Sequence, residues 1–113
     1  MPRAIPAPGG GKEATGLTDA RSKTLLDNDR VRVLELHLRP GESEPMHSHP
    51  PYLVYVISPA TMRMTDAHGN ATVVQLSAGQ VSFGSPTTHA GENVGTTELH
   101  ELIVELKDGR ASG

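Results

Sequence analysis

The 113-residue sequence contains no cysteine, and its phenylalanine, tyrosine and tryptophan residues amount to Tyr52, Tyr55 and Phe83. Without cysteine there are neither disulfides nor thiolate ligands, so any metal ion must be held by histidine, carboxylate or water. Because aromatic residues are scarce, the core must be built mainly from valine, leucine, isoleucine and methionine. We expect a core this small to draw part of its stability from a partner subunit or a bound metal ion.

The sequence also lacks an excess of basic charge and any long apolar run. A net charge of −3 creates no basic patch, so we expect no nucleic-acid partner. No apolar run approaches the ~20 residues of a membrane span, so we expect no membrane partner. The first residues lack the continuous apolar segment of a signal peptide, and we therefore expect a cytoplasmic protein.

The chain divides into two parts by composition. Residues 1–20 are rich in proline and glycine and show no periodicity, which predicts a flexible N-terminal tail. Residues 21–113 have the length of one domain. Short alternating or apolar runs bounded by Gly, Pro and Asn predict strands in this part, at residues 31–38, 52–57, 61–65, 72–76, 80–83 and 99–106.

These strands predict an all-β sandwich or barrel, because no segment has a convincing helical pattern. The run from Tyr52 to Ile57 is nearly continuous in β-branched and aromatic residues, which is typical of a strand buried on both faces. We expect Gly41 and Gly79 at turns, where a positive φ would explain the choice of glycine.

Two histidines separated by one residue, His47 and His49, follow the turn at Pro40 and Gly41. In an extended segment, residues i and i+2 point to the same side, so both imidazoles can converge on one point. Imidazole nitrogens bind Fe, Zn, Ni, Cu and Mn, and two of them form half of a metal site.

A third histidine lies in the segment from Gly79 to Asn93, where a short strand and a polar turn precede His89. Together the two segments resemble the two motifs of the cupin superfamily, over roughly residues 30–106. The matching residues are Gly41, His47, His49, Gly79, His89 and Asn93. The resemblance implies a double-stranded β-helix, the jelly-roll-like cupin barrel, with a small-molecule site inside its wider end. It also implies that His47, His49 and His89 bind one divalent metal ion (Fe, Zn, Ni or Mn).

The sequence departs from the cupin pattern at two places. Where cupins usually place a glutamate ligand, this chain has Leu53 or Val54, neither of which can coordinate a metal. The turn of the second motif is also altered, to Gly84-Ser-Pro86. The resemblance then implies a three-histidine set, as in cupin dioxygenases that use non-haem iron on small organic substrates. A metal-free pocket stays open as the alternative.

The remaining histidines are weaker candidates for this site. His68 is expected in a solvated hairpin turn, and His37 on the outer side of its strand. His100 shares a face with Leu102 and Val104, so it could face the interior, as a hydrogen-bonded core residue or beside the metal or substrate.

Other side chains could also reach the pocket. Tyr52 and Tyr55 lie on opposite faces of their strand, so only one of them can approach it. Met62 and Met64 share a face and are expected to line the barrel. Glu92 could replace the missing carboxylate ligand, although its direction cannot be read from the sequence.

Two classes of function remain open, each acting on a small molecule. One is a metal-dependent enzyme, first among them an oxygenase of a small organic substrate. The other is a non-catalytic cupin module that binds or senses a small ligand without metal. Sugar isomerase or epimerase chemistry would need an acid/base pair that the sequence does not identify. By the same resemblance we expect a homodimer, paired through edge strands.

Overall fold

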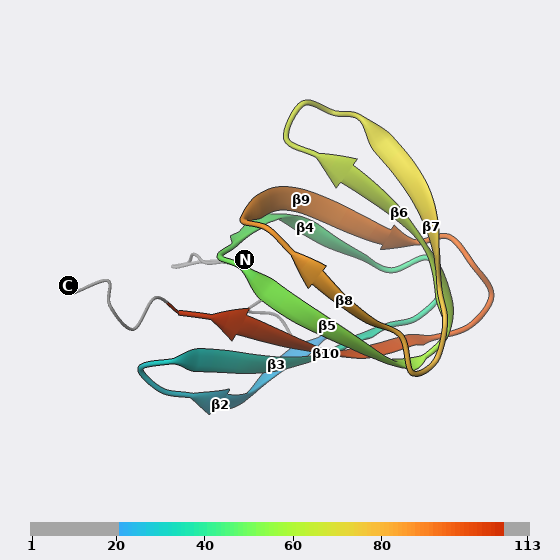
Figure 1. Ribbon diagram of the computed structural model, residues 1–113. Helices are drawn as coiled ribbons and strands as arrows, with labels where there is room; N and C mark the ends of the chain where they lie inside the picture. The colour runs from blue at the N-terminus through green and yellow to red at the C-terminus, as the bar shows by residue number, and fades with distance from the viewer. Residues whose placement is uncertain (1–20, 108–113) are drawn as a thin grey trace.

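The computed structural model describes residues 21–107, and the predicted N-terminal tail at residues 1–20 lies outside this range. Nine strands make up the described part (Figure 1). They are β2 (Ser22–Asp27), β3 (Val31–Leu38), β4 (Ser43–His49), β5 (Tyr52–Ser58), β6 (Ala60–Asp66), β7 (Ala71–Leu76), β8 (Val81–Gly84), β9 (Thr87–Asn93) and β10 (Leu99–Leu106). Within these residues no helix is long and apolar enough to span a membrane.

The strands form two antiparallel sheets that face each other. One sheet has the order β2-β3-β10-β5-β8 and the other the order β4-β9-β6-β7. Figure 1 shows the two sheets closing against each other at one side of the molecule and diverging at the other. This arrangement is a double-stranded β-helix, so the all-β prediction is confirmed.

The hydrophobic core lies between the sheets and follows from strand alternation. In β3 the residues Leu34, Leu36 and Leu38 all point inward and are fully buried. They pack against Leu99 and Ile103 of β10, which alternate in the same way. Buried polar residues, among them His47, His49 and Glu105, also lie between the sheets.

Gly41 and Gly79 both lie in turns, as the sequence predicts. Gly41 and Gly79 have φ angles of +88° and +85°, in the left-handed region where only glycine is unstrained. Gly41 lies two residues before β4, and its amide donates a hydrogen bond to the carbonyl of Asn93 at the end of β9. The turn thus sets β4 beside β9, with the histidines of both strands adjacent.

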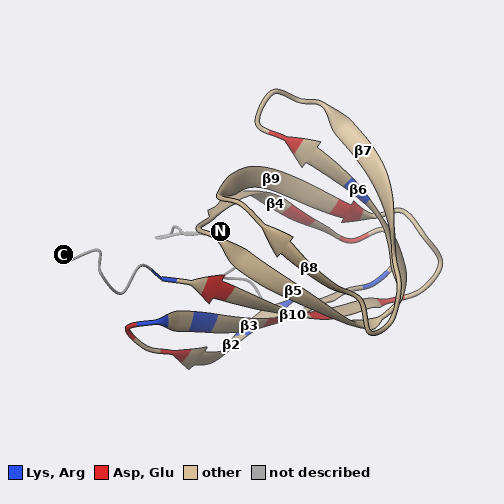
Figure 2. Ribbon diagram, viewed as in Figure 1, with Lys and Arg blue, Asp and Glu red and all other residues tan. Residues whose placement is uncertain are grey.

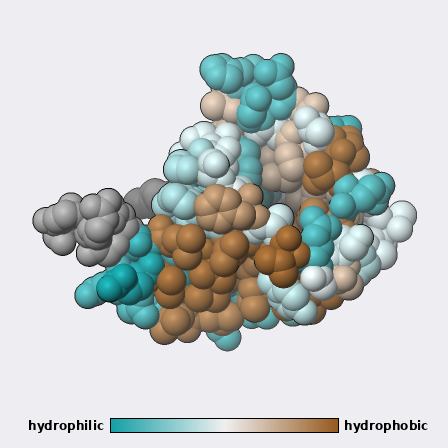
Figure 3. All heavy atoms as spheres, viewed as in Figure 1, coloured by the Kyte–Doolittle hydropathy of each residue, from teal (hydrophilic) through white to brown (hydrophobic). Residues whose placement is uncertain are grey.

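The prediction that residues 52–57 are buried on both faces is wrong. Tyr52, Val54 and Val56 point inward, whereas Leu53, Tyr55 and Ile57 point outward and are 36–45% exposed. The physical reason is that the outer face of the five-stranded sheet has no covering layer in the described residues. Figure 3 shows a broad hydrophobic surface over this sheet.

Three observed strands are not among the six predicted ranges: β2, β9 and β4, whose segment is expected from the sequence only to be extended around His47 and His49. β2 is short and almost fully exposed, and β9 contains two threonines, a histidine, a glycine and a glutamate rather than an apolar run. Strand formation in β9 depends on pairing with β4 on one side and β6 on the other. His89 therefore lies within a central strand and not at the end of a loop.

Candidate metal centre and ligand cavity

The three histidines predicted to form a site lie together between the sheets. His47 and His49 come from β4 and His89 from β9, where His89 is directly opposite His47. The ring centroids are 4.6 Å (His47–His49), 4.8 Å (His47–His89) and 5.1 Å (His49–His89) apart. One nitrogen from each ring lies within 4.8 Å of those of the other two.

Hydrogen bonds on the far side of two rings define their tautomers. His47 Nδ1 lies 2.6 Å from the carbonyl oxygen of Pro45, and His49 Nδ1 lies 2.7 Å from Oε2 of Glu105. Because both oxygens only accept, each Nδ1 carries the proton and each Nε2 keeps its lone pair. The two Nε2 atoms face each other at 2.9 Å. Facing lone pairs repel, so this donor set fits a cation between them, either a proton or a metal ion.

Glu105 is held as a carboxylate although it is buried. Burial raises its pKa, but the hydrogen bond from His49 and the charge and hydrogen bonds of Arg32 together bring the pKa below the usual value. Arg32 Nη2 and Nε lie 2.8 and 2.9 Å from Oε1 of Glu105. Figure 2 shows the corresponding acidic stretch of β10 beside a basic stretch of β3. A carboxylate behind an imidazole is the usual second partner of a metal-ligating histidine.

His89 is suited to donate a lone pair at neutral pH. Burial lowers its pKa to about 4, and the neighbouring imidazole of His49 acts in the same direction. The imidazole is therefore neutral near pH 7, which is the form that binds metal ions.

A carboxylate also stands beside the histidines on their own side. Oε1 of the buried Glu44 lies 3.9 Å from Nε2 of His47. Of the two positions where the cupin pattern places its glutamate, Val54 lines the cavity and Leu53 points outward. Glu44 thus brings a negative charge to the site from an earlier position on β4, which sequence reasoning missed.

The site opens into a cavity of about 230 Å³ between the sheets. Most of its wall is apolar, and Met62 and Met64 line it as predicted. The lining residues are Glu44, His49, Tyr52, Val54, Met62, Met64, Val74, Leu76, Ser82, His89, Leu99, Glu101 and Ile103. A cavity of this size and polarity fits a small organic molecule.

Tyr52 is the tyrosine that reaches the cavity, whereas Tyr55 is exposed. Its ring lies over His49, with centroids 4.6 Å apart. Burial raises the pKa of Tyr52, and the negative charges of Glu101 and Glu44 raise it further. The phenol therefore keeps its proton at neutral pH and is available as a hydrogen-bond donor.

Glu101 is a second cavity residue that the sequence did not indicate. It is 8% exposed, and burial raises its pKa to about 7. It lies on β10 between Leu99 and Ile103 on the inward face, with Glu105 two positions beyond Ile103. A carboxyl group that is buried in an apolar wall and half protonated near neutral pH can both accept and donate a proton there.

The interpretation that His100 could face the interior is wrong. The inward face of β10 carries Leu99, Glu101, Ile103 and Glu105, and His100 points to the opposite side. Both faces of this strand carry apolar residues, and the outward face, with Leu102, Val104 and Leu106, carries more of them than the inward face. Apolar content alone therefore indicated the wrong face.

The other side chains considered from sequence lie outside the cavity. The side chain of Glu92 is 44% exposed and forms an ion pair with Arg63 at 3.0 Å, so it does not replace the missing ligand. His37 and His68 are exposed, as predicted.

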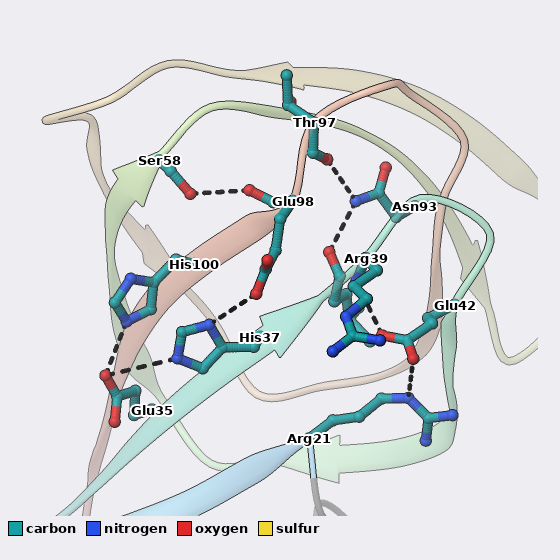
Figure 4. Close-up of polar contacts among 11 residues, drawn as sticks. Arg21, Glu35, His37, Arg39, Glu42, Ser58, Asn93, Thr97, Glu98 and His100 are labelled. Atoms are coloured by element: carbon teal, nitrogen blue, oxygen red, sulfur yellow. Dashed lines mark hydrogen bonds and ion pairs between the residues drawn. The ribbon is translucent and has the colours of Figure 1, made fainter.

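Asn93, the last residue of the second motif, is structural. Its side-chain amide donates to the carbonyl oxygens of Leu38 (2.9 Å) and Thr97 (2.8 Å), and its oxygen accepts from the Gly95 amide (3.0 Å). Figure 4 shows Asn93 joining these segments. It holds the connection between β9 and β10 against the end of β3.

Comparisons with known proteins identify the fold. No protein-family model matches the chain, and no curated protein matches it. Among solved structures, a cupin domain from Bordetella pertussis is 25% identical, with a TM-score of 0.71 over 77% of this chain and 92% of that one. A predicted oxalate decarboxylase from Thermotoga maritima is 26% identical, with a TM-score of 0.58 over 77% of this chain and 79% of that one.

A third similar structure is an uncharacterised Klebsiella pneumoniae protein with a double-stranded β-helix domain. It is 22% identical, with a TM-score of 0.63 over 84% of each chain. These proteins share the two-sheet arrangement described above.

Proposed function

We propose that this protein, whose fold is that of a small cupin domain, binds one divalent metal ion through His47, His49 and His89. The observation that carries the proposal is the pair of Nε2 atoms of His47 and His49 that face each other at 2.9 Å. Both Nδ1 atoms are already hydrogen-bonded to oxygen acceptors, so both inner nitrogens are lone-pair donors. Neutral imidazoles suit Fe, Zn, Ni or Mn, and the charge of Glu44 nearby favours a cation.

The cavity supports the second part of the proposal, that a small organic molecule binds beside the ion. Its volume of about 230 Å³ is below the range of drug-sized pockets, which suits a molecule of few heavy atoms. The molecule would contact the methionine and valine walls with its apolar part. Its polar groups would meet the ion, the Tyr52 phenol and the Glu101 carboxyl.

We further propose that the protein is a metal-dependent enzyme, first among the candidates an oxygenase of a small organic substrate. When bound, an ion held by three neutral imidazoles keeps open positions for water, oxygen or a bidentate ligand. The chain itself contributes a phenol that donates a hydrogen bond and a carboxyl that holds or releases a proton at the cavity wall. The similar Thermotoga maritima protein is a predicted oxalate decarboxylase, which supports small-molecule chemistry in this fold.

The alternative function is a module that binds a small ligand without metal, and the apolar cavity wall favours it. Two measurements distinguish the metal-dependent enzyme from the metal-free module. The protein is purified without added metal and its metal content is determined by elemental analysis, and metal is then titrated into it. Alanine at His47, His49 or His89 should lower the affinity sharply, whereas alanine at the exposed His68 should not. Iron at close to one equivalent per chain in the purified protein supports the oxygenase. Equal affinity for all four variants and the wild type contradicts the metal centre and leaves the binding module.

A further inference from the structure

We propose a second divalent-metal site, on the outer face of the five-stranded sheet, formed by Glu35 and His37 of β3 and His100 of β10. His37 and His100 are directly opposite each other in the antiparallel pair, and Glu35 lies two residues before His37 on the same face. Side chains of opposite residues are neighbours, and so are those of residues i and i+2. The three side chains therefore meet on one side of the sheet, away from the inner cavity (Figure 4).

The ligand atoms already lie close together. The rings of His37 and His100 are stacked, with centroids 4.0 Å apart and planes inclined by 19°. Glu35 Oε2 lies 2.7 Å from His100 Nε2 and 3.7 Å from His37 Nε2. The three potential ligand atoms lie within 4.8 Å of one another, so small rotations of the rings bring them to one centre.

A further carboxylate orients one of the rings. Glu98 Oε2 lies 3.0 Å from His37 Nδ1, which therefore donates its proton to Glu98. The Nε2 of His37 then carries its lone pair toward the carboxylate of Glu35. Ser58 Oγ donates a hydrogen bond to the backbone carbonyl of Glu98 at 2.8 Å, which fixes the loop that carries this residue.

The inner site has the same arrangement, because Glu105 accepts a hydrogen bond from Nδ1 of His49 and leaves Nε2 as the lone-pair donor. In both places a carboxylate behind an imidazole selects the tautomer that binds metal. Without an ion, His100 Nε2 donates its proton to the carboxylate of Glu35 at 2.7 Å, while the Nε2 lone pair of His37 points at the same carboxylate. A bound ion would replace the proton of His100 and be held by both imidazoles and the carboxylate.

The ligand chemistry indicates which ions fit. Two imidazole nitrogens and one carboxylate oxygen suit borderline ions, namely Zn²⁺, Ni²⁺ and Cu²⁺, with water completing the coordination. The side chain of His37 is 47% exposed and that of His100 25%, so an ion can enter from solvent. Because the ligands come from two strands, the ion would cross-link β3 to β10.

The test is a Zn²⁺ titration of the full chain by calorimetry, with equilibrium dialysis to count bound ions. The outer variant carries His37→Ala and His100→Ala, and the inner variant carries alanine at His47, His49 and His89. We expect the wild type to bind two ions and each variant one. The inner variant should also gain thermal stability on Zn²⁺ addition, because the remaining ion links two strands.

The outcomes separate this proposal from the inner site. If the inner variant loses ion binding and the outer variant binds as many ions as the wild type, the proposal of an outer site is wrong. If only the outer variant loses an ion, the outer site stands and the inner one fails. If the alanine variant does not fold, a variant with His37→Gln and His100→Gln replaces it, because glutamine retains side-chain volume. The control for non-specific binding to exposed imidazole is His68→Ala.

Discussion

Glu105 and His49 join the two sheets at the candidate metal centre. The residues lie 56 positions apart in the sequence, on β10 and β4, and are connected by a 2.7 Å hydrogen bond between Oε2 and Nδ1. The bond leaves the lone pair of His49 on Nε2, so Glu105 would orient a ligand of the ion that we propose.

Replacing Glu105 by glutamine should therefore weaken metal binding. The amide no longer carries the charge that stabilises the Nδ1–H tautomer of His49, and we expect the metal dissociation constant to rise about 10–100-fold. Calorimetric titration at constant pH measures this. Glu92→Gln is the matched control, because Glu92 is an exposed carboxylate paired with Arg63 on the outer side. An equal loss in both variants would contradict the role of Glu105.

Replacing Glu101 by glutamine should change the pH dependence of stability. The pKa of Glu101 is about 7 in the folded chain against 4.5 ordinarily, so between these values the folded state binds the proton more tightly than the unfolded state. The wild type therefore loses stability as pH rises from about 4.5 through 7, by roughly 3 kcal/mol in all. Glutamine does not titrate in this range, so the variant lacks this pH-dependent loss of stability.

The measurement is urea denaturation of both proteins between pH 4.5 and 8, with a chelator present. Relative to wild type, the glutamine variant should gain free energy of unfolding as pH rises and level off above pH 7. Glu92→Gln again serves as the control, without this gain. A difference that stays constant with pH would show that Glu101 is not titrating in this range.

Replacing Gly84 by alanine should disturb the cavity wall through Tyr52. A Cβ at position 84 would clash with the ring and the hydroxyl oxygen of Tyr52, so the ring has to leave the position that it takes beside His49. We expect a loss of about 1–3 kcal/mol in the free energy of unfolding. In a Tyr52→Leu background the same substitution should cost less. An equal cost in both backgrounds would mean that the ring is not the obstacle.

The homodimer stays a prediction, and we propose that its interface is the outer face of the five-stranded sheet rather than a sheet edge. One apolar residue from each strand forms a continuous row across this face, namely Leu26, Val33, Val104, Leu53 and Phe83. An exposed apolar face of this extent is typical of an interaction surface. Figure 3 shows it from one side.

Replacing Phe83 by lysine should therefore shift the protein toward monomer. The residue is 62% exposed in the single chain, so a monomer tolerates the charge, whereas an interface through this face does not. Light scattering after size-exclusion chromatography measures the mass. Val73→Lys is the control, because Val73 is 55% exposed on the other sheet. A dimer that survives at Phe83→Lys but not at Val73→Lys would place the interface on the other sheet.

By itself the sequence determined the elements that depend on local pattern. Alternation along residues 31–38 and 99–106 predicted β3 and β10, and the spacing of His47 and His49 placed both rings on one side. Gly41 and Gly79 were expected at positive φ, and the structure confirms both. Each of these properties is decided by neighbours along the chain, so it can be read from residue type and spacing.

Only the tertiary structure decided which face of a strand is covered. β10 has apolar residues on both faces, so its period of two could not show that Glu101 and Glu105 point inward and His100 outward. Other contacts join residues from different strands or depend on how the strands pack. They are the pairing of Glu105 with His49, the approach of Glu44 to His47 and the stacking of His37 on His100. These contacts are set by sheet pairing and by the packing of one sheet on the other, and no local pattern encodes them.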